Sequence, residues 1–483
     1  MAAPVVHAPC GPVVGIERPG SLAFLGIPYA AAPVGRLRFQ APEPPAPWRE
    51  PRDATRFGAT PQRRSPWAVS TIPEPSIPGE ETLNLNVFTP DRSASLPVLV
   101  YIHGGGYIAG SHVGAWFDGA TYNRDGVVVV TVSYRLGFDG FGWVTDAPAN
   151  RGLRDLVCAL EWVRNNIAAF GGDPSRVTIS GQSAGGGAVL SLLAMPSARG
   201  LFRGAIAHSP LIGLATRAQH AATGRALASA AGVQPTIAGW SSRTEDEVLD
   251  AQFAFLAALD AAGPFIADLA SAATAPCDVV RPLGPALDDA TLAVVPHAAW
   301  ARGFADDVAL LIGATRDEFV RPDADLDAGQ VRRLLDPIDL EPLLRTYLEQ
   351  CIDAGDPDPL GRLATAVLFR RPVLETAQAR TLGGARTWLY DFAHPSAVTG
   401  LAGHCLDLPF TWDALGAEGA TTVLGDAPPQ ALADAMHGAW VAFVSDGDPG
   451  WPATGTRVQG RVFGGDGEAL DDVRGLVRPT PSA

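Results

Sequence analysis

The chain contains no lysine, so all 36 of its basic residues are arginines, and they are outnumbered by 51 acidic residues. The formal net charge at pH 7 is therefore −15. Nucleic acid, or an anionic membrane that recruits a basic patch, attracts proteins with the opposite charge balance. The composition argues against both kinds of partner. We attach no function to the absence of lysine itself.

Long apolar runs are also missing. The first twenty residues contain neither a basic start followed by an apolar run nor a small-residue cleavage site, so no secretion signal is visible. Apolar stretches such as residues 127–132 are far shorter than the ~20 residues that span a bilayer. We expect a soluble cytoplasmic protein with no membrane span.

Cysteine is scarce, with five residues, at positions 10, 158, 277, 351 and 405. Their number is odd and no two of them have the CxxC spacing, which argues against a disulfide framework and against a zinc site. We expect free buried thiols.

Apolar residues make up 47% of the 483 positions and charged residues 18%, which is typical of a folded globular protein. Strand-like runs occur at residues 97–102, 126–134, 176–180, 308–312 and 386–392. Between the second and third of these, residues 151–170 carry apolar side chains at spacings of three and four, as an amphipathic helix does. This βαβ pattern predicts an α/β fold with a mostly parallel sheet.

Helical stretches follow, at about residues 215–300 and 325–380, and a final helix is expected at residues 431–444. No internal repeat is visible. We predict one catalytic domain, residues 1–483, in which the two longer helical stretches are insertions that shape a substrate pocket.

Residues 181–185 read Gly-Gln-Ser-Ala-Gly and follow the strand candidate 176–180 directly, with a helix-compatible run at residues 188–194 behind them. Gly-x-Ser-x-Gly between a strand and a helix is the context of a nucleophile elbow, where a Cβ on a flanking residue would clash. The pattern predicts that Ser183 is a catalytic nucleophile rather than part of a Gly-rich turn.

A second glycine-rich segment, His-Gly-Gly-Gly at residues 103–106, follows the strand candidate 97–102. A serine that attacks an ester creates an oxyanion, which fixed N–H groups must stabilise. An unobstructed glycine backbone after a strand supplies such donors. We expect the N–H of Ala184 to be a further donor, because the residue after the nucleophile opens a helix and its N–H has no partner there.

The acid that would orient the catalytic base follows a later strand in folds of this kind. After the strand candidate 308–312, composition does not choose between Asp317 and Glu318, and Asp306, Asp307 and Asp323 are further candidates.

The base must be a histidine late in the chain, which leaves His297, His394, His404 and His437 of the nine histidines. His437 falls in the predicted final helix, where a packing or surface role fits it better. Spacing alone makes His394 and His404 equally good candidates for the catalytic base.

Four segments resemble the type B carboxylesterases, the family that includes the cholinesterases. They are residues 24–39 (FLGIPYAAAPVGRLRF), 81–90 (ETLNLNVFTP), 98–110 (VLVYIHGGGYIAG) and 150–187, which contains FGGDPSRVTISGQSAGGG. The resemblance runs nearly end to end. It implies the α/β-hydrolase fold, hydrolysis of small-molecule carboxylic esters, and neither a cofactor nor a metal.

Site roles follow from the same resemblance. The family's acid is the Glu of an Asp-Glu pair, which corresponds to Glu318. Its histidine stands in a segment similar to residues 403–410 (GHCLDLPF), which selects His404 over His394. Gly105, Gly106 and Ala184 correspond to the donors of the oxyanion hole.

The chain departs from the family pattern near this site. Gln182 precedes the nucleophile where Glu is usual, and Asp407 stands where Glu is usual. Ser209 is followed by Pro210 where Gly is usual. These positions surround the catalytic residues, so we expect a rearranged buried hydrogen-bond network.

Two further departures concern the loop before residue 83. Thr82 stands where many secreted relatives have a disulfide cysteine, and no tryptophan stands at the position where cholinesterases use one to hold a cationic substrate. Without that ring and without a carboxylate at position 182, choline esters are expected to be poor substrates.

We therefore predict hydrolysis of neutral small or aryl esters by a Ser-His-Glu triad through an acyl-enzyme. Because His404 must start neutral, activity should rise with pH through a step near about 6.5. Two alternatives are hydrolysis of carbamates or aryl amides by the same triad, and a non-catalytic adhesion role of the kind found in relatives that have lost a triad member.

Overall fold

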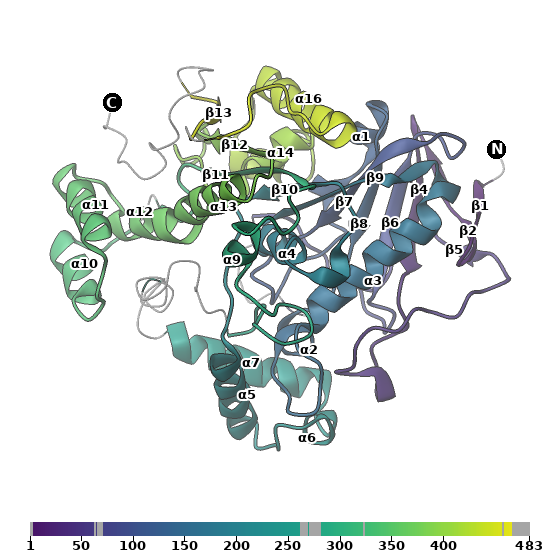
Figure 1. Cartoon of the computed structure of the whole chain (residues 1–483), viewed down its shortest axis with the longest axis horizontal. Coiled ribbons are helices and arrows are strands. Elements are labelled where there is room, and N and C mark those ends of the chain that lie inside the picture. Colours follow the sequence, from purple (N-terminus) through teal and green to yellow (C-terminus); the bar gives the residue numbers. More distant parts are fainter. Residues whose placement is uncertain are drawn as a thin grey trace.

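The computed structural model describes residues 3–61, 64, 71–260, 269, 282–321, 324–455 and 458–465. Its centre is one ten-stranded sheet flanked by helices (Figure 1). In spatial order the strands are β13 (Gly460–Phe463), β12 (Thr387–Phe392), β11 (Ala309–Thr315), β10 (Gly204–His208), β9 (Gly172–Gln182), β7 (Leu96–Ile102), β8 (Val128–Val132), β6 (Asn84–Thr89), β4 (Ser21–Pro28) and β3 (Ile16–Arg18).

Strands β13 to β8 in that order run parallel, and β6, β4 and β3 continue the sheet in antiparallel pairs. A separate small sheet holds β1 (Val5–Ala8), β2 (Gly11–Val14) and β5 (Arg52–Asp53). The predicted α/β class with a mostly parallel sheet is confirmed.

The predicted βαβ crossover is present. It leads from β8 through α3 (Arg151–Asn166), which the short turn η3 (Ile167–Phe170) continues, to β9. The two strands that it joins are not neighbours, because β7 lies between them and pairs with both. The chain therefore passes over one strand, and this places β9 and its carboxyl end in the middle of the sheet.

Helices cover both faces. The others are η1 (Gly35–Leu37), η2 (Ala115–Phe117), α1 (Ala120–Arg124), α2 (Gly137–Phe141), α4 (Ala184–Leu192), η4 (Pro196–Ala198), α5 (Arg217–Ala230), α6 (Ile237–Ser241), α7 (Glu245–Asp260), α9 (Pro296–Trp300), α10 (Ala328–Leu335), α11 (Pro342–Asp353), α12 (Pro359–Thr365), η5 (Ala366–Arg370), α13 (Arg371–Leu382), α14 (Leu408–Thr411), α15 (Ala420–Leu424) and α16 (Gln430–Asp446). No helix in the described ranges has the length and apolar character needed to cross a bilayer.

Alternate side chains of each central strand enter two different cores. In β7, Val98 and Val100 pack into the core that α3, α4 and α13 cover, whereas Leu99 and Tyr101 pack into the core under α16. This alternation with a period of two is the reason why these runs are apolar throughout, since both faces of the sheet are buried.

The two helical stretches expected at residues 215–300 and 325–380 pack differently. Helices α5, α6 and α7 share a small core of their own with α2, centred on Trp240 and Phe138. Side chains of α10 to α13 instead belong to the main core. Figure 1 shows α5 to α7 below the sheet and α10 to α12 extending from its side.

Cys10, Cys158, Cys351 and Cys405 are free thiols, and all but Cys10 are buried. Cys277 lies outside the described residues, as does Asp323.

A buried ion pair ties α3 to the segment after β8. The Asp155 carboxylate lies 2.7 Å from Nη2 of Arg135 and accepts from its Nε at 2.8 Å and from its backbone N–H at 3.0 Å. The side chains of Arg135 and Asp155 are 5% and 0% exposed, respectively. Removing one partner from such a pair leaves the other charge buried and unpaired.

Asp155→Ala should therefore lower the free energy of unfolding by about 3–5 kcal/mol, because Arg135 would lose its counter-charge. Guanidinium unfolding of the two proteins measures the difference. Arg164→Ala on the exposed side of α3 is the control and should change stability by no more than about 0.5 kcal/mol. Equal midpoints for Asp155→Ala and the control would contradict the prediction.

Candidate active site

Ser183 occupies a strained turn between β9 and α4. Its backbone has φ 56° and ψ −121°, a conformation that a residue with a side chain rarely adopts and that costs on the order of 1–3 kcal/mol. The Ser183 N–H donates to the His208 carbonyl at 2.9 Å, and the Ser183 carbonyl accepts from Leu211 at 2.9 Å. These bonds to the loop after β10 hold the turn.

Glycine is required on both sides of the serine. A Cβ at Gly181 would overlap the Gly185 carbonyl, and a Cβ at Gly185 would overlap the carbonyl of Ile102 at the end of β7. The elbow therefore presses against the neighbouring strand, as the Gly-x-Ser-x-Gly pattern predicts.

The glycine loop after β7 lies against the elbow. A Cβ at Gly104 would stand 3.2 Å from Cβ of Ser183, so the two segments touch. Gly105 and Gly106 have φ of 106° and 61°, which an L side chain disfavours. Within the described part of the chain, the N–H groups of these two glycines donate no hydrogen bond. They remain available to a ligand, as does the N–H of Ala184 in the first turn of α4.

Glu318 and Asp317 follow β11 and face different partners. Glu318, 3% exposed, accepts from the Thr315 N–H at 2.7 Å through Oε1, and its Oε2 contacts Nδ1 of His404. Asp317 instead accepts from the Ala402 N–H at 2.8 Å and pairs with Arg362. Asp317 thus links the loop that carries Glu318 to the loop that carries His404.

Asp306 and Asp307 are exposed and precede β11, so they lie at the opposite end of that strand from Glu318. Of the acids left open by composition that lie in the described ranges, Glu318 is the one that contacts a histidine near the elbow.

The other late histidines have different partners. His437 is buried in α16, with Nδ1 2.9 Å from the Thr411 carbonyl and Nε2 3.0 Å from Asp125. His297 lies in α9 near Thr376, and His394 packs beside the ring of Phe410. His404 is the histidine that meets Glu318.

Gln182, the last residue of β9, also contacts His404. Its Nε2 lies 3.1 Å from Nε2 of the imidazole, on the side that a nucleophile would use. Among the described residues, no hydrogen bond joins the Ser183 hydroxyl to His404. This contact is absent from the predictions made from the sequence, because the positions are 222 residues apart and no local pattern marks them.

Comparisons with known proteins agree with these features. A profile described as "Carboxylesterase family" matches residues 2–332. The chain is 36% identical over 471 residues to the para-nitrobenzyl esterase of Bacillus subtilis (strain 168), covering 93% of this chain and 92% of that one. It is 31% identical over 503 residues to the phenmedipham hydrolase of Pseudarthrobacter oxydans, covering 99% and 98%.

The chain belongs to the carboxylesterase family.

Solved structures support the same assignment. A thermophilic para-nitrobenzyl esterase superposes with a TM-score of 0.82 at 32% identity and 96% coverage of both chains. A carboxylesterase of Geobacillus stearothermophilus gives 0.79 at 32% identity, covering 95% of this chain and 96% of that one. The predicted α/β-hydrolase fold is confirmed, and the protein is a carboxylesterase that acts on small-molecule esters.

The imidazole of this carboxylesterase is partly buried, with 20% of its side chain exposed, and lies beside the Glu318 carboxyl group. Burial in itself lowers the pKa of His404, but the adjacent Cys405 and the Glu318 carboxylate outweigh it and raise the pKa well above its ordinary 6.5. The rings of Phe319 and Phe369 pack against the imidazole at centroid distances of 5.5 and 4.9 Å and cover part of it.

A second polar group lies behind the elbow, as the departures at positions 209 and 407 suggested. Asp407 Oδ2 lies 2.9 Å from Nδ1 of His208 and accepts from the Tyr390 hydroxyl at 2.8 Å. Trp440 Nε1 donates to Nε2 of His208 at 3.0 Å. Because tryptophan only donates, the proton of His208 sits on Nδ1 and faces Asp407.

Burial by itself raises the pKa of Asp407, but the hydrogen bonds from His208 and Tyr390 lower it by a larger amount. The pKa therefore falls below its ordinary 3.8, and the residue is an anion at neutral pH. Its Oδ1 and the Ser209 hydroxyl are buried without a partner among the described residues. Neither His208 nor Trp440 was singled out from the sequence, since neither follows a recognisable motif.

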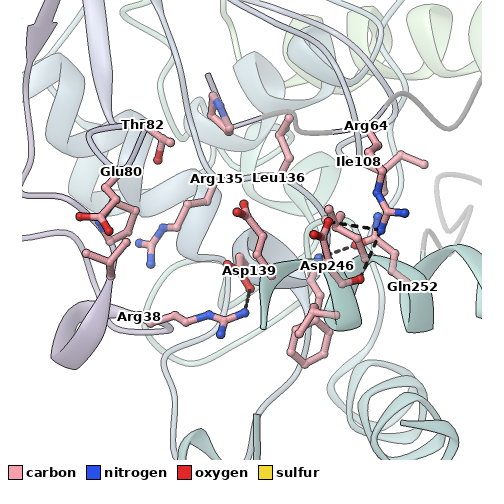
Figure 2. Close-up of a pocket in the computed structure, with 18 of the residues that line it drawn as sticks. Arg38, Arg64, Glu80, Thr82, Ile108, Arg135, Leu136, Asp139, Asp246 and Gln252 are labelled. Atoms are coloured by element: carbon pink, nitrogen blue, oxygen red, sulfur yellow. Dashed lines mark hydrogen bonds and ion pairs between the residues drawn. The ribbon is translucent and has the colours of Figure 1, made fainter. Parts of the chain in front are cut away.

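A cavity of about 660 Å³ lies beside the segment that follows the glycine loop (Figure 2). Its lining includes Ile108, the start of α2 and the face of α7 that carries Gln252. The Gly137 N–H donates to the Tyr107 carbonyl at 2.7 Å and so ties this wall to the glycine loop. Its described lining includes residues of 215–300 and none of 325–380, and it includes neither Ser183 nor His404.

Proposed function

We propose that this carboxylesterase hydrolyses neutral small or aryl esters with Ser183 as nucleophile, His404 as general base and Glu318 as the residue that orients His404. The observation that carries the proposal is the contact of His404 Nδ1 with Glu318, while the opposite nitrogen faces the end of β9 from which Ser183 projects. With Nδ1 protonated toward Glu318, Nε2 presents a lone pair, as a base must.

In the first half of the reaction, the Ser183 oxygen attacks the ester carbonyl and its proton passes to Nε2 of His404. The N–H groups of Gly105, Gly106 and Ala184 stabilise the oxyanion, and Glu318 stabilises the imidazolium. His404 then returns the proton to the departing alcohol, which leaves an acyl-enzyme on Ser183. In the second half, His404 activates water, and the same steps release the acid.

Ser183 should be the residue that an organophosphonate modifies. We expect a single adduct on Ser183 by mass spectrometry, and a loss of p-nitrophenyl ester hydrolysis of about 10⁴-fold or more in Ser183→Ala. Ser191→Ala on the same helix, whose hydroxyl donates to the Gly187 carbonyl, is the matched control and should keep both adduct and activity. A folded wild-type protein without an adduct on Ser183 would refute the proposal.

The same assay with p-nitrophenyl esters of graded acyl length, and with a matched aryl carbamate, defines the substrate class.

The pH dependence follows from the raised pKa of His404. The base form exists above that pKa, so kcat/KM should rise with pH through a limb that lies above 6.5 and reach a plateau. Hydrolysis of a neutral ester between about pH 5 and pH 9 measures it. Glu318→Gln removes the negative charge beside the imidazole and should move the limb to lower pH. A flat profile, or a limb below the ordinary histidine value, would show that His404 is not the base.

Choline esters should be poor substrates, because position 182 carries no charge and the sequence has no tryptophan at the position where cholinesterases use one to hold the cation. We expect kcat/KM for acetylcholine to be lower than for dimethylbutyl acetate, its neutral isostere. Parallel assays at one ionic strength test this, since the net charge of −15 attracts cations when salt is low. Preference for the choline ester would contradict the assignment to neutral esters.

A further inference from the structure

The carboxamide of Gln182 fills the space between the glycine loop and the imidazole. Its Nε2 lies 3.1 Å from Nε2 of His404. Its oxygen faces the other way, because a Cβ at Gly104 would stand 2.9 Å from Oε1. Gln182 is 1% exposed, so water does not replace this contact.

A carboxamide can form a hydrogen bond with a histidine in either of its protonation states. Its N–H donates to the lone pair of a neutral imidazole, and after rotation by half a turn its oxygen accepts from the N–H of an imidazolium. A carboxylate of the same shape only accepts, so it favours the charged imidazolium and opposes the neutral base.

The other groups around His404 already favour the charged form. Glu318 contacts Nδ1, the Cys405 thiol adjoins the ring, and the Asp407 carboxylate is close enough to interact with its charge. The rings that pack against the imidazole in the described part of the chain, Phe319 and Phe369, are uncharged. A carboxylate at position 182 would be a third negative charge around one imidazole.

We propose that Gln182 is a positioning residue for His404, whose uncharged carboxamide holds Nε2 in either protonation state and keeps the base form available at a lower pH than a carboxylate would allow. This inference rests on the proposed roles of Ser183 and His404.

The protons balance in this scheme. When the Ser183 proton moves to Nε2 of His404, it binds the lone pair that accepted a hydrogen bond from Gln182. The hydrogen bond from the Gln182 N–H to His404 is then lost. The rotated carboxamide accepts from the new N–H until His404 gives the proton to the leaving alcohol. Gln182 neither gains nor loses a proton.

Gln182→Glu keeps the shape and adds the charge. We expect the acid limb of kcat/KM to move upward by about one pH unit or more. Gln182→Met keeps the length without charge and should move the limb by less than half as much. Gln219→Glu is the matched control, because Gln219 is the exposed third residue of a capping box in α5, where Glu serves equally well. Its limb should coincide with that of wild type.

The proposal is wrong if the limb of Q182E coincides with that of wild type, or if Q182M moves it as far as Q182E. Should Q182E fail to fold, Gln182→Asp is the second charged variant and should move the limb in the same direction.

A second measurement needs no turnover. In protein labelled with ¹⁵N-histidine and carrying Ser183→Ala, His404 should titrate at a higher pH when Gln182→Glu is added. Equal titration in the two proteins would overturn the role of Gln182. A wild-type protein that neither hydrolyses esters nor forms a phosphonate adduct would instead overturn the proposed function, so the two failures are distinguishable.

Discussion

The parallel register of β9, β10, β11 and β12 sets Gln182, His208, Gly313 and Tyr390 in one row at the carboxyl edge of the sheet. The glycine in this row is needed for space, because a Cβ at Gly313 would overlap the ring of Tyr390. Tyr390 can therefore lie across β11 and reach both His208 and Asp407. A slip of one residue between any two of these strands would turn the row to the other face and separate its members.

The same row holds the elbow in its strained form. The carbonyl of His208 accepts from the N–H of Ser183, while the side chain of His208 is fixed by Asp407 and Trp440. Strain at a single residue persists only where its surroundings determine the backbone from several sides. Here β7 presses on Gly185, β10 holds Ser183, and α4 begins at Ala184. The position of the serine is thus a property of the sheet rather than of the turn alone.

Local sequence was enough to predict β7, β8, β9, β11 and β12, the α3 helix, the elbow and the glycine loop, because each has a period or a glycine pattern of its own. No local sequence pattern predicts that Glu318 and His404 lie in contact. This contact depends on Asp317, which joins Ala402 across 85 residues and pairs with Arg362 from α12. Composition left Asp317 and Glu318 equal for this reason, and the family resemblance was needed to assign Glu318 and His404. The Gln182 contact and the His208 group arise from the same kind of distant pairing.

Charge in the buried site is balanced by short-range partners rather than by solvent. Asp407 is kept ionised by His208 and Tyr390, and the Glu318 carboxyl group accepts from the Thr315 N–H and contacts His404. The side chain of Asp407 is shorter than the Glu usual in the family, which is consistent with the unpartnered Oδ1 and Ser209 hydroxyl beside it. Glutamine at position 182 removes a further negative charge next to the imidazole. Asp407 keeps the charge of the Glu usual at its position, so of these two departures only Gln182 lowers the number of negative charges around His404.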